Sequence, residues 1–176
     1  MKKIIILLAA AGTFSLQCAL AQVNAPATTD TATLNFVSKA THGGMMEVTT
    51  GKLAANKAQS ADVKAFGERM VRDHSKANEK LMSIAQEKTI TVPNMPPMTD
   101  DMLNSASGKE FDRQYVQMMI KDHEKTVAMF EKAAASLPDK DVKMFAAETL
   151  PILKDHAQQI KAIAAKMNLT KPQAGQ

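Results

Sequence analysis

The sequence predicts an all-α fold, namely a ferritin-like four-helix bundle of two antiparallel helical hairpins with a long crossover connection. Three observations support this prediction. Four stretches of about 25 residues repeat apolar side chains every three or four positions, the period of an amphipathic helix. No segment alternates apolar and polar residues over a useful strand length. Connections are short within each pair of stretches and 19 residues long between the pairs, as in ferritin-like bundles.

The N-terminal residues, 1–21, are predicted to be a secretory signal peptide. Lys2 and Lys3 precede an apolar stretch, and Ala19-Leu20-Ala21 forms a small-residue cleavage site. The apolar stretch is shorter than the roughly 20 residues that a membrane-spanning helix needs. Cys18 raises the alternative of a lipoprotein, but the residue before it is not the small one expected before a lipidated cysteine.

The first hairpin is predicted to open a bundle domain that spans residues 34–168. Residues 22–33 are small and polar, so we expect a disordered leader before it. The first helix is expected over residues 34–57. Ser60 is a favoured capping residue and is expected to begin the second helix, which runs to about residue 88.

The second hairpin follows the crossover connection at residues 89–107. This connection contains three prolines and no helical period, and at about 3.3 Å per residue it can run the length of a helix. The third helix is expected to start after Ser107-Gly108 and to end near Ser136. After a tight turn the fourth runs from about Lys140 to Asn168, and residues 169–176 form a frayed tail.

Composition argues against two classes of partner. Signal cleavage removes two lysines and lowers the formal net charge from +4 to +2, so the basic pI is weak evidence for a nucleic-acid or membrane partner. The absence of Trp and the single Tyr argue against base stacking and against an aromatic membrane belt. Methionine is abundant, at 13 residues. It is usually an adaptable core filler, the interpretation we favour, but in an exported protein it is also a soft ligand for Cu(I).

A five-residue motif of two apolar residues, a basic residue, aspartate and histidine occurs three times. The copies end at His74, His123 and His156, each near the middle of a different predicted helix. The apolar stripe of each helix runs through its histidine, which predicts that the imidazoles are buried. Neutral imidazole is the commonest side-chain metal ligand. His42 lies on another face and is expected at the surface.

The first helix contributes Glu47 to its stripe in place of a histidine. Gly43 and Gly44 lie one turn before it and Gly51 one turn after it. Each interior glycine costs about 1 kcal/mol relative to alanine, so these glycines indicate space for close helix contact or for a ligand.

The carboxylate and the three histidines lie at similar depths in helices of similar length. We therefore expect four residues to converge on one metal ion: Glu47, His74, His123 and His156. The alternative is that each histidine is an isolated core residue hydrogen-bonded to a neighbour. Burying such groups without partners costs several kcal/mol, and a shared cation would compensate all of them.

Aspartates directly precede the three histidines: Asp73, Asp122 and Asp155. They either orient an imidazole on a neighbouring helix or pair with the adjacent basic residues, and the sequence leaves both open. No glutamate stands three residues before a motif histidine, so the Glu-x-x-His pattern of di-iron bundles is absent. Three nitrogens and one oxygen suit Zn or Cu, and Fe is not favoured.

Several motifs resemble the exported bacterial proteins known as the domain of unknown function 4142 family, often labelled outer-membrane proteins. The motifs are Gly43-Gly44-Met45-Met46-Glu47-Val48, Val63-Lys64-Ala65-Phe66 leading to His74, Phe111-Asp112-Arg113-Gln114-Tyr115, Asp122-His123, and Thr149-Leu150-Pro151 before His156. The resemblance spans residues 34–167. It implies a ferritin-like bundle and implies no activity.

We therefore expect an exported protein that binds a transition metal. The periplasm is the expected location, with peripheral attachment to the outer membrane as an alternative. A metal-dependent oxidoreductase or hydrolase and a structural or stress-related interaction module without metal both stay open. No separate nucleophile or base is apparent, so binding is favoured over catalysis. No nucleic-acid partner and no transmembrane segment after signal cleavage are expected, and the sequence does not identify a protein partner.

Overall fold

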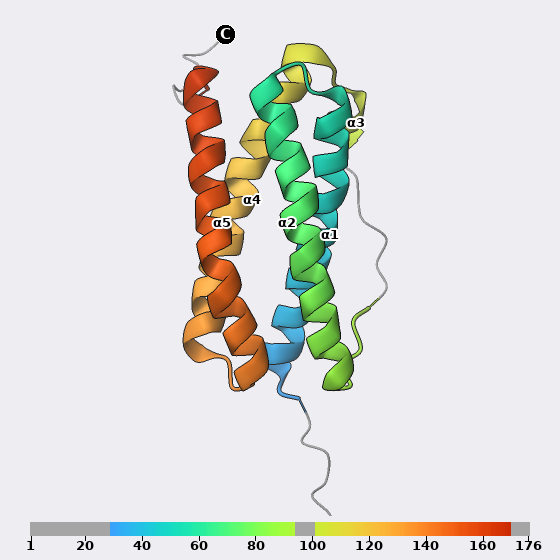
Figure 1. The fold of residues 1–176 in the computed structure, drawn as a ribbon, viewed down its shortest axis with the longest axis vertical. Coiled ribbons are helices and arrows are strands. Elements are labelled where there is room, and N and C mark those ends of the chain that lie inside the picture. Colours follow the sequence, from blue (N-terminus) through green and yellow to red (C-terminus); the bar gives the residue numbers. More distant parts are fainter. Residues whose placement is uncertain (1–28, 94–100, 170–176) are drawn as a thin grey trace, which may run out of the picture.

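The computed structural model describes residues 29–93 and 101–169. Within these ranges it contains five helices and no strand (Figure 1): α1 Thr31–Lys57, α2 Ala61–Glu87, α3 Asp101–Ser105, α4 Gly108–Ser136 and α5 Lys140–Lys166. The predicted signal peptide lies outside the described residues, as do most of the predicted leader and tail. None of the described helices is both long enough and apolar enough to cross a membrane.

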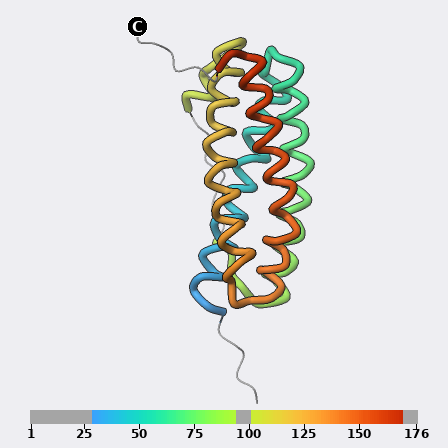
Figure 2. The backbone as a smooth tube through the Cα atoms, turned by 90° about the vertical axis from the view of Figure 1, so that its left-hand side faces the viewer, coloured from blue at the N-terminus to red at the C-terminus, as the bar shows by residue number. Residues whose placement is uncertain are grey.

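The long helices form two antiparallel hairpins, α1 with α2 and α4 with α5. In Figure 1, α1 and α5 run upward whereas α2 and α4 run downward. Figure 2, turned by 90°, shows α4 and α5 side by side along their length. Because α2 and α4 run in the same direction, the chain returns along the bundle between them. The predicted fold class is therefore confirmed, including its crossover.

The start of the first helix and the connection between the hairpins differ from the prediction. α1 begins three residues earlier than expected, because Asp30 caps it by accepting a hydrogen bond from the Thr33 amide at 2.9 Å. The connection predicted to lack helical structure contains α3. Leu103 on this short helix is only 2% exposed and packs in an apolar cluster with Ala58 and Phe111, which explains why this turn is ordered.

The start of α2 is held by a residue on another hairpin. The Asp112 carboxylate on α4 is buried and accepts hydrogen bonds from the backbone amides of Gln59 and Ser60 at 3.0 and 2.7 Å. Ser60 is the N-cap residue of α2, as predicted, but its side chain makes no capping hydrogen bond. Because Asp112 is the acceptor, it ties the α1–α2 turn to the beginning of α4.

The core consists of two apolar clusters separated by a polar layer. One cluster lies near the α1–α2 turn and includes Phe66, Met70, Phe111, Tyr115, Met119, Ile160 and Ile163. The other lies towards the opposite end and includes Phe36, Val37, Leu81, Phe130, Phe145 and Leu153. Between them lie four buried ionisable residues, Glu47, His74, His123 and His156. Each long helix contributes one of these four residues, so the layer crosses the bundle at mid-height.

One apolar residue of the five-residue motif on α5, Ile152 of Ile152-Leu153-Lys154-Asp155-His156, faces solvent. Ile152 is 45% exposed, whereas Leu153 is 1% exposed. Thr149 and His156 are both buried on this helix. Ile152 and Leu153 each lie three or four positions from both of them, the spacing of residues that share a helix face. The periodicity alone therefore does not distinguish them.

Candidate metal centre

Three histidines from three helices meet in the polar layer. The ring centroids of His74 and His123 are 5.9 Å apart, those of His74 and His156 5.3 Å, and those of His123 and His156 5.5 Å. One nitrogen of each ring lies within 4.8 Å of one nitrogen of each other ring. His123 and His156 are fully buried and His74 is 5% exposed. The rings are thus close enough to share one small ligand.

Each imidazole is held through one of its nitrogens. His74 Nδ1 lies 3.1 Å from Glu47 Oε2, and His123 Nδ1 lies 3.0 Å from the Met119 carbonyl oxygen. His156 Nε2 lies 2.9 Å from Asp73 Oδ2. An N–H of His123 and of His156 donates to its oxygen acceptor, which fixes the tautomer of these two rings, and the Glu47 carboxyl group lies at ion-pair distance from His74 Nδ1 and orients the third.

The second nitrogen of each ring is buried and has no hydrogen-bond partner within the described part of the chain. These nitrogens are His74 Nε2, His123 Nε2 and His156 Nδ1. With the other nitrogen protonated, each presents a lone pair. Three such acceptors without a donor are costly to bury, and a metal ion would satisfy all three together.

Burial favours the neutral form of these rings. It lowers the pKa of His74 to about 3 and the pKa of His123 to about 4, and repulsion by His156 adds to both shifts. Burial also lowers the pKa of His156, against the opposing hydrogen bond to Asp73. At neutral pH the lowered pKa values keep the three imidazoles in their neutral form, with one N–H each, so that none has to lose a proton before it binds a cation.

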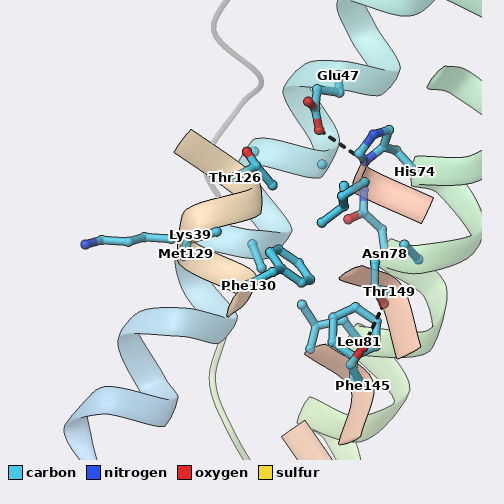
Figure 3. Close-up of a pocket in the computed structure, with 15 residues that line it drawn as sticks. Lys39, Glu47, His74, Asn78, Leu81, Thr126, Met129, Phe130, Phe145 and Thr149 are labelled. Carbon is cyan, nitrogen blue, oxygen red and sulfur yellow. Dashed lines mark hydrogen bonds and ion pairs between the residues drawn. The ribbon is translucent and has the colours of Figure 1, made fainter. Parts of the chain in front are cut away.

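The predicted fourth ligand, Glu47, lies at the edge of this cluster. Its Oε2 contacts His74 (Figure 3), and its Oε1 is 3.5 Å from His123 Nδ1 but makes no hydrogen bond. Both contacts are to Nδ1 atoms, whereas the unpaired atoms of these two rings are the Nε2 atoms. Burial, with repulsion from Asp122, raises the pKa of Glu47 to about 8. In this position the carboxyl group orients the imidazoles.

The three motif aspartates occupy different environments. Asp73 accepts from His156, an imidazole on a neighbouring helix, and from Arg69. Burial opposes ionisation of Asp73, but these two hydrogen bonds outweigh it and its pKa is lowered. Asp155 is exposed and pairs with Arg69 at 2.6 Å. Asp122 is half-buried, its pKa is raised by burial, and among the described residues no hydrogen bond joins it to a histidine.

Arg69 is a site residue that the sequence reasoning missed. From α2 it contacts Asp73 on its own helix and both Asp155 and Gln159 on α5, at 3.1, 2.6 and 2.6 Å. Arg69 therefore holds Asp73, the hydrogen-bond acceptor of His156, in place. The spacing of four between Arg69 and Asp73 was the only available signal, and such pairs are common on helix surfaces.

The glycines near Glu47 have two different roles. A Cβ on Gly44 would lie 2.2 Å from the Asn78 Oδ1 atom, and one on Gly51 would lie 2.7 Å from the Gly67 carbonyl oxygen. These two glycines allow α1 and α2 to approach closely. A Cβ on Gly43 would meet nothing within 4 Å. Close helix contact thus explains two of the three predicted glycines, and open space surrounds the third.

A cavity borders the polar layer on the side of the second apolar cluster (Figure 3). Residues of all four long helices line it, among them Gly43, Glu47, His74, Leu81 and Phe130. A separate groove between α2 and α5 reaches both His74 and His156. The layer is therefore bordered by open space although its side chains are buried.

The fourth histidine does not join the cluster. His42 is half-buried on α1, less exposed than expected, and it stands outside the histidine cluster, as predicted. Its Nδ1 atom is buried without a hydrogen-bond partner in the part of the chain that the structure describes.

Comparison with known proteins identifies the family. The model of the family described as Domain of unknown function (DUF4142) matches residues 18–163. The chain belongs to this family. This DUF4142 chain therefore has the membership that its motifs suggested. No curated protein matches it.

Several solved structures share the fold of this DUF4142 chain. CopM in its Cu(I)-bound form is 18% identical, with a TM-score of 0.68, and the match covers 77% of this chain and 96% of CopM. A DUF305 fragment from Deinococcus radiodurans is 12% identical, with a TM-score of 0.63 and coverages of 78% and 98%. A two-domain protein from Anabaena variabilis with a ferritin-like domain is 13% identical, with a TM-score of 0.60 and coverages of 84% and 41%. At these identities the likeness concerns the fold alone.

Proposed function

We propose that this DUF4142 protein binds one copper ion through His74 Nε2, His123 Nε2 and His156 Nδ1. The observation that carries the proposal is the orientation of the three rings. Each ring has one nitrogen close to an oxygen atom, hydrogen-bonded in His123 and His156 and at ion-pair distance in His74, and one buried nitrogen without a partner among the described residues. Metal-binding histidines commonly show this division, with the outer hydrogen bond fixing the tautomer.

The spacing of the rings supports a mononuclear site. Three nitrogens about 2.0–2.1 Å from one ion are roughly 3.3–3.5 Å apart. One nitrogen of each ring lies within 4.8 Å of one nitrogen of each other ring, so side-chain shifts of about an ångström would bring three nitrogens into this range. Each imidazole comes from a different helix, and metal binding would therefore join both hairpins.

Ligand chemistry and fold similarity both favour copper. Imidazole suits Cu and Zn, and Cu(II) binds a given nitrogen site more tightly than Zn(II). CopM, which shares the fold, is described in Cu(I)-bound, Cu(II)-bound and Ag-bound forms. Iron has less support, since the positions three residues before the histidines hold Val71, Ile120 and Leu153 and leave no Glu-x-x-His motif. In this proposal Glu47 and Asp73 orient imidazoles. Glu47 therefore supports the site and is not itself a metal ligand, unlike in the sequence-based prediction.

Titration of the purified protein with Cu(II) and Zn(II) tests the proposal. We expect one equivalent of either ion to bind, with Cu(II) the tighter. At a free ion concentration 100 times the Kd, binding adds about 2.7 kcal/mol, or roughly 5–10 °C in Tm. His123→Leu removes a ligand but fills the core, so it should abolish the metal-induced rise in Tm.

His42→Leu is the matched control, because this histidine lies outside the cluster, and it should keep the full rise in Tm. If His123→Leu still binds one equivalent with unchanged affinity, the histidines are core residues and the proposal is wrong. A protein that binds neither ion would contradict it as well.

We also propose that the protein is exported and acts in the periplasm. The basic and apolar N-terminus with its Ala19-Leu20-Ala21 site supports this. Mass spectrometry of the protein from a periplasmic fraction should give an N-terminus at Gln22. A lipid on Cys18, or an uncut N-terminus, would contradict it.

A further inference from the structure

A groove between α1 and α4, beside the histidine cluster, has three methionines among its lining residues. Met46 of α1 lines it together with Met118 and Met119 of α4. Met119 belongs to an apolar core cluster, and Met118 packs against that cluster. Met46 is half-buried and belongs to neither cluster. Core filling, the usual role of methionine, therefore does not account for Met46.

The groove also contains a buried oxygen atom without a hydrogen-bond partner. Glu47 lines the groove, is only 6% exposed, and its Oε1 makes no hydrogen bond within the described residues. Asp122 lines the same groove and is half-buried, with Lys125 beside it as the one cation of the lining. Two carboxyl groups and three thioethers form a lining that suits a soft cation.

The groove is connected to the histidines through two of its lining residues. Glu47 Oε1 is 3.5 Å from His123 Nδ1, and the Met119 carbonyl oxygen lies 3.0 Å from the same nitrogen. The groove between α2 and α5 reaches the centre from other helices, at His74 and His156. The methionine-lined groove therefore reaches the centre on the side of His123.

We propose that the α1–α4 groove is a second site, which binds Cu(I) through the thioethers of Met46, Met118 and Met119 and delivers it to the histidines. This inference rests on the proposed function, because the histidines are the destination of the ion. Thioethers select Cu(I) over Zn(II), whereas imidazoles accept both metals. The groove would thus give copper selectivity to a centre whose own ligands provide little.

Methyl NMR of protein labelled with ¹³C at the methionine methyl groups tests the site, with Ag(I) as a redox-inert probe. Ag(I) should shift the methyl signals of Met46, Met118 and Met119. The signal of Met144 should not move, since that residue is 55% exposed on α5, away from the groove. Unmoved signals for the three groove methionines would overturn the inference.

Delivery is tested with the double variant Met46→Leu/Met118→Leu, which keeps side-chain volume and leaves the buried Met119 intact. Loading of Cu(I) from a chelator onto the histidines should slow by about tenfold, the lower end of the 10–100-fold loss of metal affinity that mutation of groups around a metal site commonly causes. Zn(II) affinity should not change, and Met144→Leu is the matched control. Unchanged Cu(I) loading in the double variant would contradict delivery through the groove.

The outcomes separate this inference from the proposed function. In His123→Leu, Ag(I) should still shift the groove methyl signals, although copper no longer binds the histidines. If the histidines bind copper and the methyl signals never move, the groove inference fails and the proposed function stands. If the methyl signals move but the wild-type histidines bind no copper, the proposed function and the delivery step fail together.

Discussion

Two alanine substitutions on the same helix should change stability in opposite directions. Gly51→Ala places a methyl group 2.7 Å from the Gly67 carbonyl oxygen and 3.1 Å from Met70 Cβ. A backbone carbonyl cannot rotate away, so α1 and α2 must separate. Such overpacking costs about 1–3 kcal/mol, and the better helix propensity of alanine returns up to about 1 kcal/mol. We expect a net loss of about 1–2 kcal/mol.

Gly43→Ala is the matched control. It makes the same chemical change two turns earlier, where the added methyl meets nothing within 4 Å. Only the propensity gain applies, so stability should rise by about 0.5–1 kcal/mol. Urea unfolding of the metal-free proteins gives both free energies, and the Tm values should differ by roughly 5 °C or more between the two variants. A shift of the same sign in both would refute the reasoning from helix contact.

The Gly43 variant also tests what its open space is for. Gly43 borders the cavity beside Glu47 and the groove between α1 and α4. If this space serves a ligand, Gly43→Ala should stabilise the metal-free protein and yet reduce its metal-induced rise in Tm. Natural proteins often give up stability in this way at functional sites. An unchanged metal response would show that the glycine is not retained for the ligand.

Two further predictions concern the groups around the histidines. Asp73→Asn removes the anionic acceptor of His156 and should weaken metal binding by about 10–100-fold. Asp155→Asn, at an exposed position, should leave metal binding unchanged. Competition with a chelator measures both affinities. A large effect of the Asp155 variant would contradict this assignment. The pKa of Glu47 is raised to about 8, so its contribution to stability is fully present below its unfolded pKa near 4.5 and is lost as pH rises towards 8. Metal-free Glu47→Gln should therefore lose less stability than the wild type between pH 5 and about 8 in urea unfolding, and parallel curves would contradict it.

The fold was predictable because its signals lie in the sequence itself. The helical period of the apolar residues predicted the four long helices, and the long connection at residues 89–107 predicted the crossover. Equal helix lengths then placed residues of similar depth at one level, which brought His74, His123 and His156 together. Short local features were less predictable, since α3 depends on the burial of Leu103 by residues distant in the chain.

The sequence could not show which side chain contacts which. Asp73, Asp122 and Asp155 occupy the same position in their motifs, and only helix packing decides that Asp73 meets an imidazole. The same holds for Asp112, whose partners are amides more than fifty residues away. Helix rotation of a few tens of degrees also exchanges Ile152 for Leu153 in the core, and a spacing of three or four is compatible with both.

The polar layer between the two apolar clusters has a consequence for how the hairpins align. A long connection between α2 and α4 does not itself fix how far one hairpin slides along the other. Sliding by one helical turn, about 5.4 Å, would move Glu47 and the histidines against apolar side chains. Burying them there without partners would cost several kcal/mol. The layer thus fixes the axial alignment of the two hairpins, just as one buried polar position sets the alignment of a coiled coil. A fully apolar replacement would remove that penalty and leave the hairpins free to dock in more than one alignment.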